Sequence, residues 1–218
     1  MSKKIVLATR NKGKIAEFER LLSEFASDIR VLGLADFPDM PDVDETGSTL
    51  TENALLKSRQ IAQYSQLPAL ADDSGLFISA LGGDPGVYSA RWAGRHGDDQ
   101  ANTEKVLSQL RELERGELER GESEQGGAID RSASFKCVIA LSFPEVHPQH
   151  GRDIVEEGEM KGSIIDAPRG DGGFGYDPIF LPDGYSLTSA EISPELKDKL
   201  SHRGRAMRQI APILISLL

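Results

Sequence analysis

The alternation of short apolar segments with amphipathic stretches constrains the fold of this chain most strongly. The continuous apolar run at residues 5–8 is typical of a buried strand, and the next apolar residues, Ile15, Phe18, Leu22 and Phe25, recur at helical spacing. By the same reading, further strands are predicted at 29–34, 67–71, 132–143 and 152–165, and further helices at 49–65, 99–114 and 206–217. At the start of the helix at 49–65, Thr49 and Glu52 have the spacing of a capping box. Strands that alternate with helices in this way predict an α/β protein.

Composition narrows the class of protein. The chain has 218 residues and a net charge of -10, which suits one sizeable core and argues against a surface that coats nucleic acid. Its one cysteine, Cys137, excludes an internal disulfide and a thiolate zinc cluster. There is no apolar run of membrane-spanning length and no signal-peptide pattern, so we expect a cytoplasmic protein that does not engage a membrane.

No linker divides the chain into independent domains, so residues 1–218 are expected to form a single domain. The stretch at about 112–128 is rich in charge and glycine and has no apolar face. Such a segment cannot bury enough apolar surface to order itself, and we predict a surface loop there.

The basic turn at residues 9–14, "TRNKGK", follows the first predicted strand directly. Where a strand turns into a helix, the first N–H groups of the helix point outward and, with the helix dipole, form an anion site. Lys12 and Lys14 add positive charge and Gly13 lets the backbone approach a ligand. A phosphate chain fits this turn, with a plain turn as the alternative. The sequence does not match a P-loop, because Ala8 stands at the first glycine position of that pattern and Ile15 at its hydroxyl position.

Two adjacent carboxylates, Asp72 and Asp73, stand where the strand that begins at residue 67 is predicted to end. Because successive side chains of an extended segment point to opposite faces, we expect the two aspartates to have different roles. Carboxylates beside a phosphate site suggest Mg²⁺, which takes oxygen ligands from a few carboxylates and from substrate phosphates. A turn is the alternative, since Asp, Ser and Gly are common turn formers.

Two further segments suggest ligand contacts. In "DGGFGYDPIF", glycines surround the aromatics Phe174 and Tyr176, and an aromatic on such a loop can stack on a nucleobase. In "KLSHRGRAM", Ser201 is a candidate N-cap that His202 and Arg203 follow. The alternatives are an aromatic that fills the core and a charged helix junction.

Together these motifs resemble the inosine/xanthosine triphosphate pyrophosphatase family, also called the dITP/XTP diphosphatases. The matching segments are "ATRNKGK", "ETGSTLTENALLKS", "ALADDSGL", "LGGDPGVYSARWAG", "GGFGYDPIF" and "SHRGRAM", in this order and over nearly the full length. The resemblance implies a two-lobed α/β fold, an elongated mixed sheet flanked by helices with the active-site cleft between the lobes. It also implies a homodimer, Mg²⁺, and hydrolysis of ITP, dITP and XTP to the monophosphate and pyrophosphate.

The resemblance also implies roles for individual residues. Asp73 corresponds to the proton acceptor and metal ligand. Asp44 corresponds to the second metal ligand, although Asp44 and Glu45 stand where the family usually has two glutamates, which leaves the choice between them open. The expected substrate contacts are Thr9, Arg10, Asn11, Lys12, Gly13, Lys14, Asn53, Lys57, Ser74, Phe174, Gly175, Tyr176, Asp177, Lys197, His202 and Arg203. Asn53 and Lys57 are four residues apart in one predicted helix, so we expect them to project from the same helix face.

The expected chemistry follows from these groups. Mg²⁺ and the basic turn neutralise the phosphate oxygens while Asp73 activates a water that attacks the α-phosphorus. Lys197 and Arg203 can only donate hydrogen bonds, so a pocket that contains them favours bases with a carbonyl at C6 over adenine. Two other functions stay open, a Maf-like nucleotide pyrophosphatase of different specificity and a non-catalytic nucleotide-binding regulator.

Overall fold

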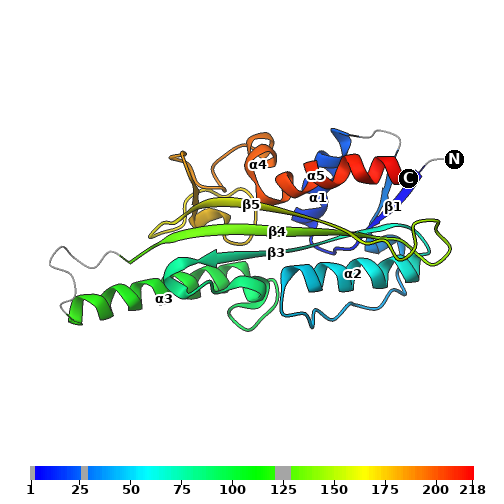
Figure 1. The fold of residues 1–218 in the computed structure, drawn as a ribbon. Coiled ribbons are helices and arrows are strands. Elements are labelled where there is room, and N and C mark those ends of the chain that lie inside the picture. The colour runs from blue at the N-terminus through cyan, green and yellow to red at the C-terminus, as the bar shows by residue number, and fades with distance from the viewer. Residues whose placement is uncertain (1–2, 26–28, 121–128) are drawn as a thin grey trace. The chain divides into compact units, whose positions relative to one another are not determined.

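Residues 3–25, 29–120 and 129–218 are described by the computed structural model of the chain (Figure 1). The chain forms two compact units. Unit 1 comprises Met1–Ser74, Cys137–Glu159 and Asp198–Leu218, and unit 2 comprises Gly75–Lys136 and Met160–Lys197.

Among the described residues, strands and α-helices alternate as far as the fourth strand, after which two more strands and two helices follow. In chain order they are β1 (Lys3–Leu7), α1 (Lys12–Ser23), β2 (Ile29–Leu32), α2 (Leu50–Ser65), β3 (Ala69–Ile78), α3 (Asp99–Arg120), β4 (Ser132–Ser142), β5 (Ile154–Ile164), β6 (Phe180–Pro182), α4 (Pro194–Leu200) and α5 (His202–Leu217). The strands form a 6-stranded sheet in the order β2-β1-β3-β4-β5-β6. β1 runs parallel to β2 and β3, whereas β6 is antiparallel to β5, so the sheet is mixed and the predicted α/β class is confirmed.

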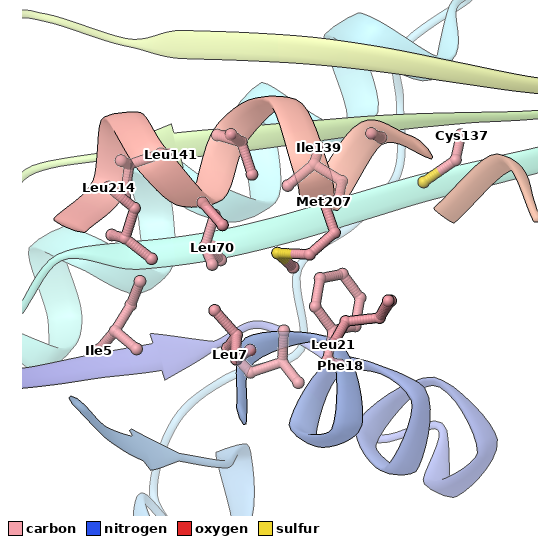
Figure 2. Packing of buried hydrophobic residues seen from close by; sticks show 14 of the residues in the cluster. Ile5, Leu7, Phe18, Leu21, Leu70, Cys137, Ile139, Leu141, Met207 and Leu214 are labelled. Carbon is pink, nitrogen blue, oxygen red and sulfur yellow. The ribbon is translucent and has the colours of Figure 1, made fainter. Parts of the chain in front are cut away.

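The sheet of unit 1 carries apolar side chains on both faces, which is why residues 5–8 are apolar without interruption. On one face, Ile5 and Leu7 pack with α1 and α5 (Figure 2). On the other face, Val6 and Ala8 pack with residues of α2. The first cluster includes Ile5, Leu7, Phe18, Leu21, Leu70, Cys137, Ile139, Leu141, Met207 and Leu214. These two cores hold α1 and α5 on one face of β3 and α2 on the other.

Side-chain caps determine where the helices begin. The capping box predicted for α2 is present: the Glu52 N–H donates to Thr49 Oγ1 at 3.1 Å, and the Thr49 N–H donates to Glu52 Oε2 at 3.2 Å. Asn11 caps α1, and Ser201 caps α5 as the sequence indicated. The basic turn at residues 9–14 therefore contains an ordinary N-cap, Asn11, and α1 begins at the next residue.

Strand β3 is longer than the sequence predicted. We expected a strand that ends at the two aspartates, but β3 runs from Ala69 to Ile78, so Asp72 and Asp73 lie within it. β1 pairs with β3 only at Val6–Leu7, and β3 continues beyond that pairing beside its other neighbour, β4. Asp72 and Asp73 are therefore residues of a strand, and the turn considered as the alternative is absent at these two positions.

Helix α3 is also longer than predicted. It extends to Arg120, so residues 112–120 are helical rather than part of a loop, while 121–128 lie outside the described residues. The residues that extend this helix beyond the prediction are mostly Glu, Leu and Arg, which have high intrinsic helix propensity. Glu114 also pairs with Arg131 at 2.9 Å. Among the described helices, none has the length and apolar character needed to cross a bilayer.

Gly158→Ala is expected to destabilise the fold. A Cβ at Gly158 of β5 would lie 2.0 Å from the His202 carbonyl oxygen and 2.7 Å from the Ala206 nitrogen, both backbone atoms of α5. We expect the free energy of unfolding, measured by urea denaturation, to fall by about 1–3 kcal/mol, as for other overpacked sites. Gly116→Ala in α3 is the control, because its Cβ would meet nothing within 4 Å and should stabilise the helix by roughly 0.5–1 kcal/mol. Equal stability of the two variants would contradict this close packing of β5 on α5.

Candidate active site

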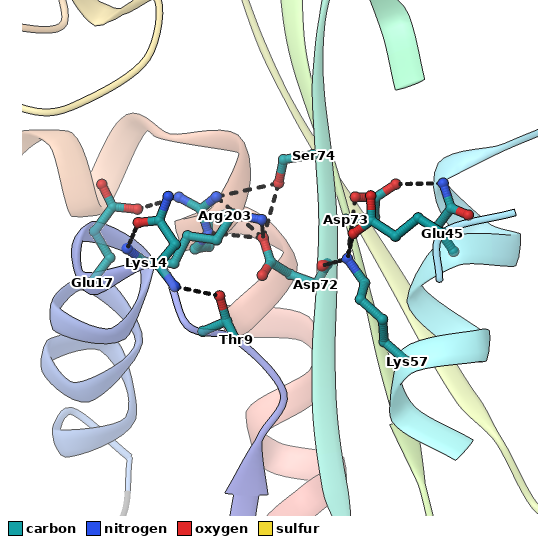
Figure 3. Close-up of polar contacts among 11 residues, drawn as sticks. Thr9, Lys14, Glu17, Glu45, Lys57, Asp72, Asp73, Ser74 and Arg203 are labelled. Carbon is teal, nitrogen blue, oxygen red and sulfur yellow. Dashed lines mark hydrogen bonds and ion pairs between the residues drawn. The ribbon is translucent and has the colours of Figure 1, made fainter. Parts of the chain in front are cut away.

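The two aspartates of β3 point to opposite faces of the sheet, as the alternation of a strand predicts (Figure 3). Leu70 packs with the α1 and α5 cluster, so Asp72, two residues later, faces the same side. Ala71 packs with the α2 cluster, so Asp73 faces α2. Both carboxylates are buried, with 2% and 7% of their surface exposed. Each must therefore be compensated on its own face.

Asp72 is compensated by cations from two helices. Its Oδ2 atom lies 2.9 Å from Lys14 Nζ, accepts from Arg203 Nε and Nη2 at 3.3 and 3.2 Å, and accepts from Ser74 Oγ at 3.1 Å. Arg203 also donates through Nη1 to the buried carboxylate of Glu17. The result is a closed ionic cluster that joins β3, α1 and α5.

The charges in this cluster determine how Asp72 titrates. Burial alone would raise its pKa, but the positive charges of Lys14, Arg203 and Lys57 outweigh burial and hold the pKa well below its ordinary value. Burial would lower the pKa of Arg203, and the carboxylates of Asp72 and Glu17 raise it instead. Asp72 is therefore ionised at neutral pH and is a poor proton acceptor.

Asp73 lies in a different electrostatic environment. Lys57 Nζ contacts its Oδ1 at 3.2 Å, and Asn53 Nδ2 donates to its Oδ2 at 3.2 Å. Lys57 Nζ also donates to Glu45 Oε1 at 2.8 Å and to the Asp72 carbonyl at 2.6 Å. Burial raises the pKa of Asp73, the Lys57 charge opposes this and the Glu45 charge adds to it, so the pKa is raised overall. A raised pKa makes Asp73 the better proton acceptor of the pair.

Lys57 itself stays charged. Burial would lower the pKa of its ammonium group, but the negative charges of Asp73, Glu45 and Asp72 outweigh burial and raise it. Asn53 and Lys57, four residues apart on α2, approach Asp73 from the same helix face. The expected pairing of these two residues at the site is thus present in the structure.

The carboxylates on the α2 side suit a magnesium ion. Glu45 and Asp73 both contact Lys57, whereas Asp44 is exposed. The structure therefore brings Glu45, and not Asp44, to Asp73. Mg²⁺ is usually held by one or two carboxylates together with substrate phosphates and water. Among the residues that the structure describes, no group of three or more His, Cys, Asp or Glu could hold a metal ion.

The basic turn lies on the Asp72 face of β3, but part of it is already engaged. The Asn11 N–H donates to Thr9 Oγ1 at 3.2 Å, and the Lys14 N–H donates to Asn11 Oδ1 at 3.0 Å. Arg10 forms an exposed ion pair with Asp42. Fewer N–H groups of the first helical turn are therefore open to an anion than the sequence suggested, and the Lys14 side chain is paired with Asp72.

The aromatic loop belongs to unit 2. Tyr176 is buried, and its hydroxyl donates to the Ser89 carbonyl at 2.8 Å, so it anchors the loop. Phe174 is half-buried, with Lys197 Nζ 4.8 Å from its ring centroid. Lys197 Nζ also donates to Asp177 Oδ2 at 2.6 Å. Of the two aromatics, Phe174 is therefore the more exposed.

The expected base-side residues divide between the units. Phe174–Asp177 and Lys197 are in unit 2, whereas His202 and Arg203 open α5 in unit 1. Sequence reasoning missed Glu17. The one feature of the sequence that could have indicated Glu17 is its position beside Phe18 in the apolar stripe of α1, where a solvated side chain would not be expected.

Arg203→Ala is expected to destabilise the protein strongly, because it leaves Asp72 and Glu17 buried with less compensation. Breaking a buried ion pair in this way typically costs about 3–5 kcal/mol. The control is Arg10→Ala, whose pair with Asp42 has side chains that are 55% and 85% exposed and should contribute less than about 1 kcal/mol. Urea unfolding of both variants measures the difference, and similar losses would show that the cluster around Asp72 does not stabilise the fold.

The mixed α/β fold, the basic helix start and the buried carboxylate–lysine pairs are typical of proteins that act on phosphorylated ligands. Comparison with known proteins makes this more specific. The profile of the Ham1 family matches residues 5–213, and the chain belongs to that family.

Named relatives align over nearly the full length. A dITP/XTP pyrophosphatase of Streptomyces coelicolor is 44% identical over 215 residues, which cover 99% of this chain and 98% of the relative. One from Mycobacteroides abscessus is 45% identical over 218 residues, which cover 99% and 96%. Among solved structures, a HAM1 protein from Coxiella burnetii is 42% identical with a TM-score of 0.79, and the alignment covers 98% of this chain and 99% of that one.

Proposed function

We propose that the chain is a Mg²⁺-dependent pyrophosphatase that hydrolyses ITP, dITP and XTP to the nucleoside monophosphate and pyrophosphate. The observation that carries the proposal is Asp73, a buried carboxylate that shares the Lys57 ammonium group with Glu45 and has a raised pKa. The names of the relatives support the substrate class. Such an enzyme removes purine nucleotides outside the standard set from the nucleotide pool.

The residues of unit 1 supply the hydrolytic groups. Glu45 and Asp73 would hold the magnesium ion, which when bound neutralises charge on the phosphate oxygens. Asp73 orients a water and takes its proton as the water oxygen bonds to the α-phosphorus. The bond from that phosphorus to the bridging oxygen breaks, and pyrophosphate leaves. Lys57, 3.2 Å from Asp73 Oδ1, would stabilise the negative charge that develops, and Lys14, 2.9 Å from Asp72 Oδ2, is the second candidate for this role.

The loop of unit 2 is assigned to the purine. Phe174 offers a half-buried ring for stacking. Lys197 donates to Asp177 beside that ring, and its ammonium group, which can only donate hydrogen bonds, suits a carbonyl at C6 better than an amino group. Arg203 is only 2% exposed, and a base contact would require its guanidinium to leave Asp72 and Glu17. We therefore assign selectivity to Lys197 and give Arg203 the role of holding Asp72.

Two other functions make different demands on the site. A nucleotide-binding regulator has no use for a buried carboxylate with a raised pKa, so Asp73 favours an enzyme. A Maf-like pyrophosphatase would use the same chemistry on other nucleotides, and the names of the relatives favour the inosine and xanthosine substrates. The homodimer and the cytoplasmic location stay predictions from the family resemblance.

A panel of nucleoside triphosphates tests the function. We expect pyrophosphate release from ITP, dITP and XTP to exceed release from ATP and GTP, and Asp73→Asn to lower the rate by roughly 10² to 10⁴, the usual loss of a general base. The asparagine keeps the shape of the side chain, so calorimetry should still show nucleotide binding. Orthophosphate as the product, selectivity for other nucleotides, or an active Asp73→Asn variant would each contradict the proposal.

The second metal ligand can be identified by comparing single variants of two adjacent residues, Asp44 and Glu45. Glu45→Gln should raise the Mg²⁺ concentration for half-maximal activity at least about tenfold, because it removes one of two carboxylates. Asp44→Asn should leave it unchanged, since that side chain is exposed. Direct calorimetric titration with Mg²⁺ separates binding from turnover. A larger effect at Asp44 would show that the substrate complex uses the other carboxylate.

A further inference from the structure

The loop that carries Phe174 is built from glycines in the left-handed region. Gly170, Gly173 and Gly175 have φ values of +83°, +73° and +63°. Glycine enters this region without steric cost, but it also adopts many other conformations, so the backbone around Phe174 has little rigidity of its own. Any fixed orientation of the Phe174 ring must come from contacts that hold the loop from outside.

Each residue from Phe174 to Tyr176 has a hydrogen bond that restrains it. The Phe174 N–H donates to Asp177 Oδ2 at 2.8 Å, within the loop. The Tyr176 hydroxyl donates to the Ser89 carbonyl at 2.8 Å, in the interior of unit 2. The Gly175 N–H donates to Asp99 Oδ2 at 2.7 Å, 76 residues away in the sequence. Asp99, as the acceptor of this bond, thus holds the peptide unit that directly follows Phe174.

Asp99 is the first residue of α3, but the helix does not need its side chain as a cap. The preceding Asp98 performs that role: its Oδ1 accepts from the Ala101 N–H at 3.2 Å, and its carbonyl accepts from the Asn102 N–H at 2.9 Å. The Asp99 carboxylate is directed to the loop instead. It also adds to the effect of burial in raising the pKa of Tyr176, which keeps that hydroxyl protonated as a donor.

We propose that Asp99 is a positioning residue for the purine: by holding the Gly175 N–H it keeps the Phe174 ring in the orientation that stacks on the base. The inference rests on the proposed function, because it concerns the same loop. Asp99 does not touch the substrate in this proposal. It lowers the cost of ordering the loop on binding, which is the usual way that preorganisation raises affinity.

The test uses ligands that engage different parts of the site. IMP carries the purine with one phosphate, whereas pyrophosphate carries no base. By calorimetry we expect Asp99→Ala to weaken IMP binding by about fivefold to tenfold, the effect of one charge-assisted hydrogen bond, and to leave pyrophosphate binding unchanged. Asp99→Asn keeps an acceptor oxygen and should restore IMP affinity to within about twofold of the unaltered chain. In turnover of ITP, KM should rise while kcat stays nearly constant.

Asp98→Ala is the matched control, since it removes the cap of α3 and leaves the loop contact in place. It should lower the Tm without a selective loss of IMP affinity. Hydrogen exchange at Gly175 reports the anchor directly and should accelerate in Asp99→Ala only. Faster exchange with unchanged IMP affinity overturns the inference, as does an equal loss of IMP and pyrophosphate or no binding of IMP by the unaltered chain. Failure of the proposed function appears separately, as absent pyrophosphate release from ITP.

Discussion

The contact of Asp72 with Lys14 and Arg203 is the interaction on which the arrangement of unit 1 depends. A buried carboxylate is tolerated only with compensating charge, and here the charge comes from the first turns of α1 and α5. Those helices are fixed to β3 by the charge balance as well as by their apolar faces. Because the positive charges on that side outweigh burial, Asp72 stays ionised, and the next residue faces a different set of groups.

The same strand thereby presents two carboxylates of opposite character. On the α2 face a single ammonium group, Lys57, is shared between Asp73 and Glu45, and the carboxylates outnumber it. The surplus negative charge and the burial keep the affinity of Asp73 for a proton high. A metal cation suits such a site, since its positive charge offsets the surplus and it can in turn bind the anionic phosphates of a substrate.

Local patterns allowed much of this to be predicted from the sequence. The capping box of α2, the opposite faces of the aspartates and the pairing of Asn53 with Lys57 depend on spacing within a few residues, and all are present. The roles of Glu17 and Arg203 could not be predicted, because their contact joins residues 186 positions apart. Glycines marked the aromatic loop, but the burial of Tyr176 rather than Phe174 depends on Ser89, 87 positions away.

Because both aspartates lie inside β3, the number of residues that precede them in the strand decides which face each carboxylate occupies. Side chains along a strand change face at every residue, so moving a segment by one position exchanges its two faces. One residue inserted between Leu70 and Asp72 would turn Asp72 toward Lys57 and Asp73 toward Arg203, with every residue of the site still present. Steps of two residues would preserve the faces. In this part of the chain, therefore, length is constrained as strictly as composition, and an even change in length is the only kind that keeps each carboxylate on its own side.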